Sequence, residues 1–218
     1  RYYDAIEILQ KAGHLFACEC SRSKISNYSV SKIYSGTCRN KKINFIKENQ
    51  TWRGIVPEDT FVCYSTLKNN NQKIDLTKVI GDFVIRRRDG LPAYQIASLM
   101  DDIEMNVNLI VRGSDLISST GAQIFLAKCL NNSFFPSSHF VHHMLMKDES
   151  GEKLSKSSGN HSLKYLRNKY TSPAIIYQQS AEILNLPFKD IQNLQDLKEV
   201  FRIGMIQRKN FILFDDKL

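Results

Sequence analysis

The second part of the chain alternates between helical patterns and short apolar runs, and this alternation constrains the fold more than any other feature of the sequence. Residues 93–100 and 120–130 carry apolar side chains at helical spacing, and residues 118–120 offer N-caps for the second helix. Residues 108–111 form an apolar run typical of a strand buried on both faces, and residues 140–145 predict a further strand. Helices that alternate with strands indicate half of a parallel α/β sheet.

The residues before this stretch lack the alternation. Residues 2–12 predict an amphipathic helix with Gly13 at its C-terminal cap. Residues 16–38 hold three cysteines among polar side chains, which predicts irregular backbone that needs a stabilising cross-link. Residues 39–80 are polar, and the three asparagines at 69–71 predict an exposed loop tip.

Two further segments frame the alternating part of the chain. Residues 82–87 predict a strand, because apolar side chains there alternate with charges, and residues 89–90 mark a tight turn. Residues 161–210 have a mostly helical pattern, which Pro173 and Pro187 interrupt.

Composition excludes several classes of protein. Of 218 residues, 42% are hydrophobic and 24% charged, which is ordinary globular usage and not that of a disordered tail or a collagen-like fibre. No apolar run approaches the ~20 residues of a membrane helix, and no secretory signal opens the chain. We therefore expect no membrane partner, and we expect a cytoplasmic location.

The chain is basic, with 30 Lys and Arg against 22 Asp and Glu and a net charge of +8. A basic domain commonly meets a polyanion such as nucleic acid or nucleotide phosphate, although a solvated basic surface has the same composition. The candidates for contacts with a phosphate backbone are Arg22, Lys24, Lys41, Lys42 and the arginines at 86–88.

A lysine- and serine-rich segment lies at residues 151–159, between two glycines. Its ammonium groups, from Lys153 and Lys156, can close over phosphates and neutralise charge that grows on a triphosphate in a transition state. A solvent-exposed surface loop explains the same composition. The familiar phosphate-binding motifs G-x-x-x-x-G-K-[ST] and G-x-G-x-x-G are absent from the sequence.

Four motifs, taken in order, resemble those of the class I glutamyl-tRNA synthetase family. They are R-R-D-G-L-P-A-Y-Q at 87–95, D-D at 101–102, V-R-G-S-D-L at 111–116 and K-L-S-K-S at 153–157, the last with Leu where the family has Met. The resemblance covers roughly residues 1–160. It implies a Rossmann-type catalytic domain that makes glutamyl-adenylate from L-glutamate and ATP, the ATP accompanied by Mg²⁺.

The resemblance also implies roles for particular residues. Tyr94 and Arg112 line the glutamate pocket, and Lys153, Ser155 and Lys156 bind ATP, with the two lysines catalytic. A guanidinium suits a carboxylate through paired hydrogen bonds, and Arg112 follows an expected buried strand, where such folds bind ligands. Without the family pattern, a core aromatic at 94 and a surface salt bridge at 112 are the alternatives. Asp115 is a hypothetical orienting partner of Arg112.

The five cysteines are an odd number, which argues against a disulfide framework and leaves a metal site or buried thiols. The pattern C-x-C … Y-x-x-x-C resembles the zinc site of one subgroup, the glutamyl-queuosine tRNA(Asp) synthetases. This resemblance implies a structural Zn²⁺ site formed by Cys18, Cys20, Tyr34 and Cys38. Cys63 and Cys129 fall outside the pattern, and we expect them in the core.

The expected fold is α/β: the second half of a class I synthetase catalytic domain, with an inserted zinc-binding subdomain and a short helical C-terminus. Residues 1–15 end the first catalytic half, 16–80 form the inserted region, 81–160 the second half with its lysine loop, and 161–218 the helical end. The family's H-I-G-H-like motif, which contacts ATP, is missing from the sequence. We therefore expect an incomplete N-terminus and a chain that does not activate glutamate efficiently by itself.

The expected function is transfer of glutamate to the queuosine base of tRNA(Asp), because only residues 160–218 follow the lysine loop and the subgroup lacks a separate anticodon-binding domain. One alternative is a fragment of an ordinary glutamyl-tRNA synthetase that charges tRNA(Glu). Another is a non-catalytic, zinc-stabilised RNA-binding remnant.

Overall fold

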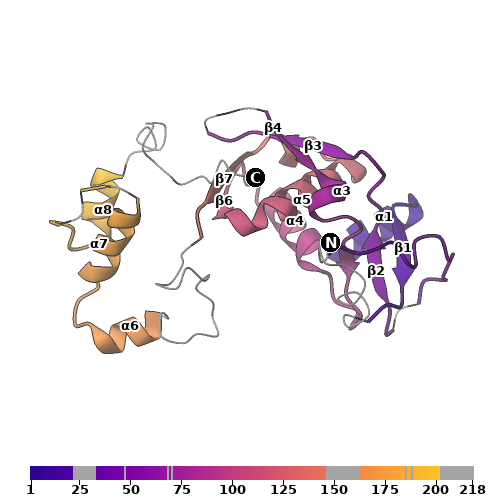
Figure 1. Cartoon of the computed structure of the whole chain (residues 1–218), viewed down its shortest axis with the longest axis horizontal. Helices are drawn as coiled ribbons and strands as arrows, with labels where there is room; N and C mark the ends of the chain where they lie inside the picture. The colour runs from indigo at the N-terminus through magenta and orange to yellow at the C-terminus, as the bar shows by residue number, and fades with distance from the viewer. Residues whose placement is uncertain are drawn as a thin grey trace. The chain divides into compact units, whose positions relative to one another are not determined.

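The chain folds into two compact units. The first comprises Arg1–Val111 and Leu116–Val141, and the second comprises Arg112–Asp115 and His142–Leu218. The structure is a computed structural model, and it describes residues 1–21, 33–46, 48–67, 69, 71–145, 163–184, 186–187 and 189–201. Figure 1 shows the elements along the chain.

A helix and a three-stranded antiparallel sheet begin the first unit. Helix α1 (Tyr2–Lys11) is followed by Gly13, whose positive φ of 75° ends the helix as expected. Strands β1 (Leu15–Cys18), β2 (Thr51–Gly54) and β5 (Val84–Arg86) are ordered β1-β2-β5. The expected irregular backbone over 16–38 is thus wrong at its start, because Phe16, Ala17 and Cys18 pair with β2.

A β-hairpin and a short helix follow within the polar segment. Strands β3 (Phe61–Tyr64) and β4 (Gln72–Asp75) pair antiparallel, and the exposed Asn69 and Asn71 lie in the connection, as predicted. The Asp75 side chain caps α3 (Leu76–Val79) by accepting a hydrogen bond from the Thr77 N–H.

The alternating part of the chain forms α4 (Tyr94–Glu104), β6 (Leu109–Gly113), a 3₁₀ turn η1 (Ser114–Leu116), α5 (Ile117–Cys129), a second 3₁₀ turn η2 (Phe135–Ser137) and β7 (His139–His143). Strands β6 and β7 begin side by side, because the His139 N–H donates to the Asn108 carbonyl at 2.9 Å. They therefore run in the same direction, and α5 is the crossover of a β–α–β unit.

Two details of this part differ from the sequence prediction. Residues 118–120 are not N-caps, because η1 has already wound the chain and α5 begins at Ile117. Within the helix Thr120 donates its hydroxyl to the Leu116 carbonyl at 3.3 Å. Strand β6 is not buried on both faces either: Leu109 and Val111 are 40% and 61% exposed, and only the Ile110 and Arg112 side of the strand is buried.

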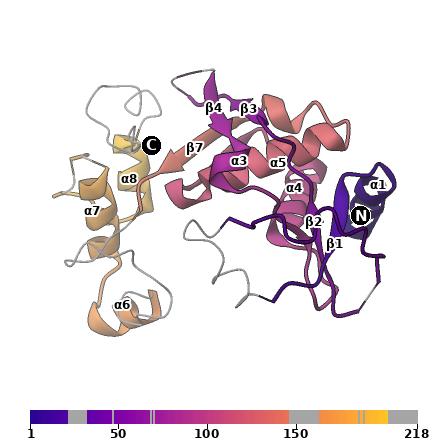
Figure 2. The same ribbon diagram turned by 45° about the vertical axis from the view of Figure 1, so that its right-hand side comes forward.

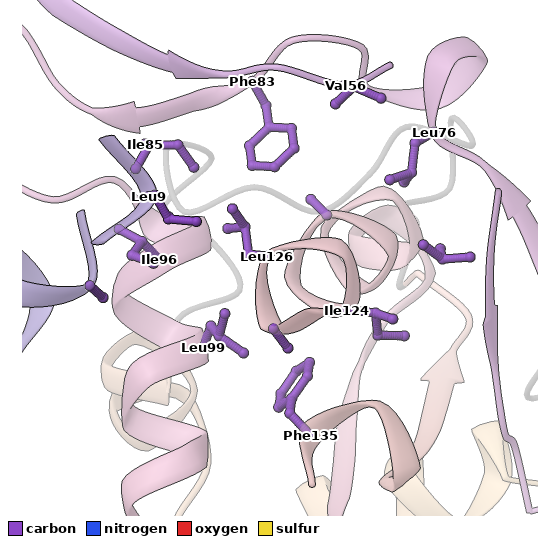
Figure 3. Packing of buried hydrophobic residues seen from close by; sticks show 14 of the residues in the cluster. Leu9, Val56, Leu76, Phe83, Ile85, Ile96, Leu99, Ile124, Leu126 and Phe135 are labelled. Carbon is purple, nitrogen blue, oxygen red and sulfur yellow. The ribbon is translucent and has the colours of Figure 1, made fainter. Parts of the chain in front are cut away.

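The core of the first unit lies around α5. Its buried side chains come from α1, α3, α4, α5, η2, the three-stranded sheet, the β3–β4 hairpin and strands β6 and β7. Figure 3 shows several of them, including Leu9, Ile85, Leu99, Ile124 and Phe135. Helix α5 packs against α4, α3 and β3. Gly121 permits the approach to α3, since a Cβ at that position would lie 2.6 Å from Leu76 Cδ2.

The second unit contains three helices, α6 (Leu163–Lys169), α7 (Ala174–Ile183) and α8 (Leu194–Val200). Pro173 precedes α7 and Pro187 lies between α7 and α8, which confirms the predicted breaks. Helices α7 and α8 lie side by side (Figure 2) and bury Ala181 with Leu186 and Ile191. In the part of the chain that the structure describes, the longest helix has 13 residues, too short to cross a membrane.

Leu99→Ala should lower the free energy of unfolding by about 2–5 kcal/mol, because Leu99 is fully buried between α4 and the rest of the core. Met105→Ala, at the end of the same helix, should change it by less than about 0.5 kcal/mol, since Met105 is 70% exposed. Denaturant unfolding of the whole chain measures both. Equal losses for the two variants would contradict this account of the core.

Candidate functional site

Three sulfur atoms and one phenol meet at the end of β1. The Sγ atoms of Cys18, Cys20 and Cys38 all lie within 4.8 Å of one another. The Tyr34 hydroxyl lies 3.4 Å from Cys18 Sγ and 3.6 Å from Cys20 Sγ, and it accepts a hydrogen bond from the Cys38 N–H at 2.8 Å. The structure thus brings together the four residues that the sequence predicted as one site.

Local structure explains why these four residues converge. Cys18 ends β1, and Cys20 follows two positions later, the spacing that returns a side chain to the same face of an extended segment. The Tyr34 ring stacks on Phe16 of the same strand, with centroids 6.1 Å apart. Gly36, at a φ of 75°, turns the chain so that Cys38 comes back to the Tyr34 hydroxyl.

The cluster has its own small core and its own electrostatics. Phe16, Cys18, Tyr34 and Cys38 are buried together, apart from the main core. Burial raises the pKa of Cys20 and that of Tyr34. Burial also acts to raise the pKa of Cys38, but hydrogen bonds with the Tyr34 hydroxyl and the Glu19 backbone outweigh it, so the Cys38 pKa is lowered. Cys38 therefore becomes a thiolate more readily than Cys20.

The chemistry of the cluster suits a metal ion better than a disulfide. The Sγ atoms of Cys20 and Cys38 are 3.6 Å apart, far beyond the ~2.05 Å of an S–S bond, and all three cysteines are free. Soft sulfur donors around one point are a possible metal site, and Cys18, Cys20 and Cys38 form it in this structure.

The two cysteines outside the cluster differ from expectation. Cys63 is exposed on β3, and Cys129, at the end of α5, is only partly buried, so the prediction that both lie in the core is wrong for Cys63. Alternate residues of β3 face opposite sides of the hairpin, and Cys63 falls on the side away from the core, while Val62 and Tyr64 are buried.

A buried charge network adjoins the cluster. The carboxylate of Asp82 accepts a hydrogen bond from the Val56 N–H at 2.8 Å and pairs with Arg39 at 3.3 Å. Arg53 donates to the Asp82 carbonyl at 3.1 Å, and its guanidinium lies over the Tyr34 ring. Burial raises the pKa of Asp82, opposed by the Val56 hydrogen bond and by the charges of Arg39 and Arg53.

The basic residues predicted to follow a phosphate backbone do not behave alike. Lys41, Lys42, Arg87 and Arg88 are exposed, whereas Arg86 is buried over the Trp52 ring and does not present its charge to a ligand. Arg22 and Lys24 lie outside the described residues.

The two predicted glutamate-binding residues belong to different units. Tyr94 is the first residue of α4 and is 51% exposed, so it is not a core aromatic. Arg112 is buried on β6, so it is not a surface residue. The Asp115 side chain lies close to the backbone of Gly113, since a Cβ on Gly113 would lie 2.5 Å from Asp115 Oδ1. The proposed action of Asp115 on Arg112 stays a prediction.

His142 is a candidate that the sequence analysis did not select. It is buried on β7, the strand paired with that of Arg112. Burial, and then the charge of Arg112, lower its pKa to about 4, so the imidazole is neutral at physiological pH. The sequence signal that could have identified His142 is its position in the strand predicted at residues 140–145, shortly before the lysine-rich segment. Lys153, Ser155 and Lys156 themselves lie outside the described residues.

Comparison with known proteins agrees with the resemblance. A family model described as tRNA synthetases class I (E and Q), catalytic domain, matches residues 1–217. The chain is 35% identical over 157 residues to the glutamyl-Q tRNA(Asp) synthetase of Acinetobacter baylyi, covering 72% of this chain and 51% of that protein. It is 37% identical over 171 residues to the enzyme of the same name from Cupriavidus metallidurans, covering 74% and 54%. The chain thus spans about half the length of the curated relatives it matches.

The fold has a counterpart among solved structures. A glutamate-tRNA synthetase from Elizabethkingia anophelis superposes with a TM-score of 0.65 at 17% sequence identity, covering 99% of this chain and 50% of that one. At this identity the likeness concerns the fold, which is that of a class I aminoacyl-tRNA synthetase catalytic domain. With the family match over nearly its whole length, the chain belongs to the class I tRNA synthetases (E and Q), catalytic domain.

The buried ion pair predicts a difference in stability. Asp82→Ala should lower the free energy of unfolding by about 3–5 kcal/mol, because it leaves the Arg39 guanidinium and the Val56 N–H without their acceptor and removes the negative charge beside Arg53. Asp89→Ala, which breaks the exposed pair with Arg87, should cost at most about 1 kcal/mol. Chemical denaturation of the two variants tests this, and similar losses would show that Asp82 does not organise its surroundings.

Proposed function

We propose that this chain is part of an enzyme that activates L-glutamate with ATP and transfers it to the queuosine base of tRNA(Asp). The observation that carries the proposal is the family match over residues 1–217 together with relatives at 35–37% identity named glutamyl-Q tRNA(Asp) synthetase. The reaction has two steps. A carboxylate oxygen of glutamate attacks the α-phosphorus of ATP and pyrophosphate leaves; the adenylate then passes its glutamyl group to the nucleic acid and AMP is released. The enzyme works in the cytoplasm, where its cysteines stay reduced.

The proposed roles follow from the chemistry of each side chain. Arg112 holds a carboxylate of glutamate through paired hydrogen bonds, and the exposed Tyr94 is the second residue proposed to bind glutamate. Neutral His142 beside Arg112 adds no competing positive charge. Lys153, Ser155 and Lys156 bind the triphosphate of ATP, which Mg²⁺ accompanies, and the two lysines stabilise the charge that develops on the triphosphate.

The proposed domain organisation keeps the boundaries read from the sequence: residues 1–15, 16–80, 81–160 and 161–218. The sheet joins two of these segments, because β5 from the third pairs with β2 from the second. The inserted region is therefore built onto the catalytic domain through shared strands and is not a separate module.

The metal is proposed to be a structural Zn²⁺, with Tyr34 as its fourth ligand. An ion about 2.3 Å from sulfur and about 2.0 Å from oxygen has tetrahedral edges of about 3.8 Å between sulfurs and about 3.5 Å between sulfur and oxygen. The distances of 3.6 Å between Cys20 and Cys38 and of 3.4 and 3.6 Å from Tyr34 to Cys18 and Cys20 fit these edges. Four protein ligands close the coordination shell, so the ion would hold the inserted region together and would not meet substrate.

Metal analysis tests this site directly. The chain purified without chelators should carry about one equivalent of zinc, and Cys38→Ser should carry less than half an equivalent, because a thiolate ligand is lost. Cys63→Ser is the matched control and should keep its zinc, since Cys63 is exposed outside the cluster. Elemental analysis gives both numbers. Zinc below half an equivalent in the unaltered chain would count against the site.

Glutamate-dependent exchange of pyrophosphate into ATP tests the activation step in the full-length enzyme. Lys156→Ala should slow the exchange at least tenfold, since removing one charge-stabilising group commonly costs about 10²–10³ in rate. Lys164→Ala, on the exposed surface of α6, should leave it unchanged. Unchanged exchange in Lys156→Ala would remove that lysine from the mechanism.

Charging assays with the same full-length enzyme identify the tRNA that accepts the glutamyl group. Glutamate should be transferred to tRNA(Asp) that contains queuosine and not to tRNA(Asp) that lacks it. Charging of tRNA(Glu) would identify an ordinary glutamyl-tRNA synthetase. Salt-dependent tRNA binding without pyrophosphate exchange would identify a non-catalytic RNA-binding protein.

A further inference from the structure

A buried arginine faces the ring of the proposed tyrosine ligand. Arg53 lies on β2, is 7% exposed, and holds its guanidinium carbon 4.0 Å from the centroid of the Tyr34 ring. This distance is well inside the ~6 Å within which a cation is attracted to an aromatic face. The phenol oxygen of the same ring contacts the sulfurs of Cys18 and Cys20 and accepts a hydrogen bond from the Cys38 N–H.

Asp82 holds the guanidinium of Arg53 in this place. Arg53 Nη1 donates to the Asp82 carbonyl oxygen at 3.1 Å, and the Asp82 carboxylate is fixed by the Val56 N–H and by Arg39. Among the residues that the structure describes, the buried Nε of Arg53 has no hydrogen-bond partner. Arg53 is therefore a buried charged group with an incomplete set of hydrogen bonds. Such a group lowers the stability of a fold unless its charge is compensated.

The charges around the cluster balance when a metal is present. Arg39 and Arg53 bring two positive charges and Asp82 one negative charge, so one positive charge is in excess. Three thiolates with one divalent cation and a neutral phenol carry one net negative charge. The two groups are in contact through the Tyr34 ring, and together they are neutral.

We propose that Arg53 is a positioning residue of the metal centre, which compensates its negative charge and orients the Tyr34 ring, and so strengthens metal binding. The inference rests on the zinc site proposed above and goes beyond the four ligands. Residues next to the ligands of a metal commonly contribute about 10–100-fold to its affinity, which sets the size of effect to expect.

Arg86 is a matched control on the neighbouring strand. It lies on β5, is also 7% exposed, and places its guanidinium 4.7 Å from the centroid of the Trp52 ring. Its Nη1 donates to the Gln50 carbonyl at 3.4 Å. Arg86 therefore makes the same kinds of contact as Arg53, but with a ring that is not part of the cysteine cluster.

The experiment measures the Zn²⁺ affinity of the whole chain by competition with a chromophoric chelator, for the unaltered protein and for Arg53→Gln, Arg53→Lys and Arg86→Gln. Arg53→Gln keeps a donor for the Asp82 carbonyl but removes the charge, and should bind Zn²⁺ about 10–100-fold more weakly. Arg53→Lys keeps the charge and should lie closer to the unaltered protein. Arg86→Gln should differ less than threefold. The metal-induced rise in melting temperature should fall in the same order.

The outcomes separate this inference from the zinc site itself. If the unaltered chain binds Zn²⁺ and Arg53→Gln binds it within threefold as tightly, the inference is overturned and the site stands. An equal loss of affinity in Arg86→Gln would also overturn it, because the loss would then not require a charge beside Tyr34. Equal losses in Arg53→Lys and Arg53→Gln would overturn it as well, because the affinity would then not depend on the charge of residue 53. A chain that binds no Zn²⁺ overturns both. Far-ultraviolet circular dichroism of the metal-free variants confirms that each remains folded.

Discussion

The Tyr34 hydroxyl is the point at which the contacts of Cys18, Cys20 and Cys38 meet. It reaches the sulfurs of Cys18 and Cys20 and accepts the Cys38 N–H, so it joins the end of a strand to a turn twenty residues further along the chain. The small core around it contains few apolar side chains, whereas each ordered residue costs about 1–2 kcal/mol of backbone entropy. Hydrophobic burial alone is a weak basis for such a segment, and convergent polar and sulfur contacts supply what the core lacks.

The sequence predicted the regular elements well where their side chains repeat with one clear period. Helix α1 and the stop at Gly13, the β5 strand with its turn, and the β–α–β unit around α5 all follow such patterns. Errors arose where two structures share one pattern. Leu109, Ile110 and Val111 are apolar in succession whether both faces of a strand are buried or only one, and the structure leaves two of the three exposed.

The cysteine cluster could be predicted from the resemblance to a family pattern, but its surroundings could not. Cys18, Cys20, Tyr34 and Cys38 are close in sequence, and a family pattern connects them. Arg53 and Asp82 are brought to the cluster by strand pairing and by the loop that precedes β5. Arg86 shows the same limitation: three consecutive arginines are typical of a solvated surface, yet Arg86 lies under Trp52 because both faces of β5 are covered.

The cysteine cluster and the predicted substrate residue Tyr94 are connected within one unit. Glu19, between two of the sulfur donors, accepts a hydrogen bond at its carbonyl from Arg88 at 2.8 Å, and its backbone also bonds Cys38. Arg88 lies in the turn whose residues lead into α4, and Tyr94 is the first residue of that helix. Catalysis that brings two reactants together requires its binding groups to be held within fractions of an ångström. The hydrogen bond from Arg88 to Glu19 therefore links the cysteine cluster to the turn that leads into the helix of Tyr94.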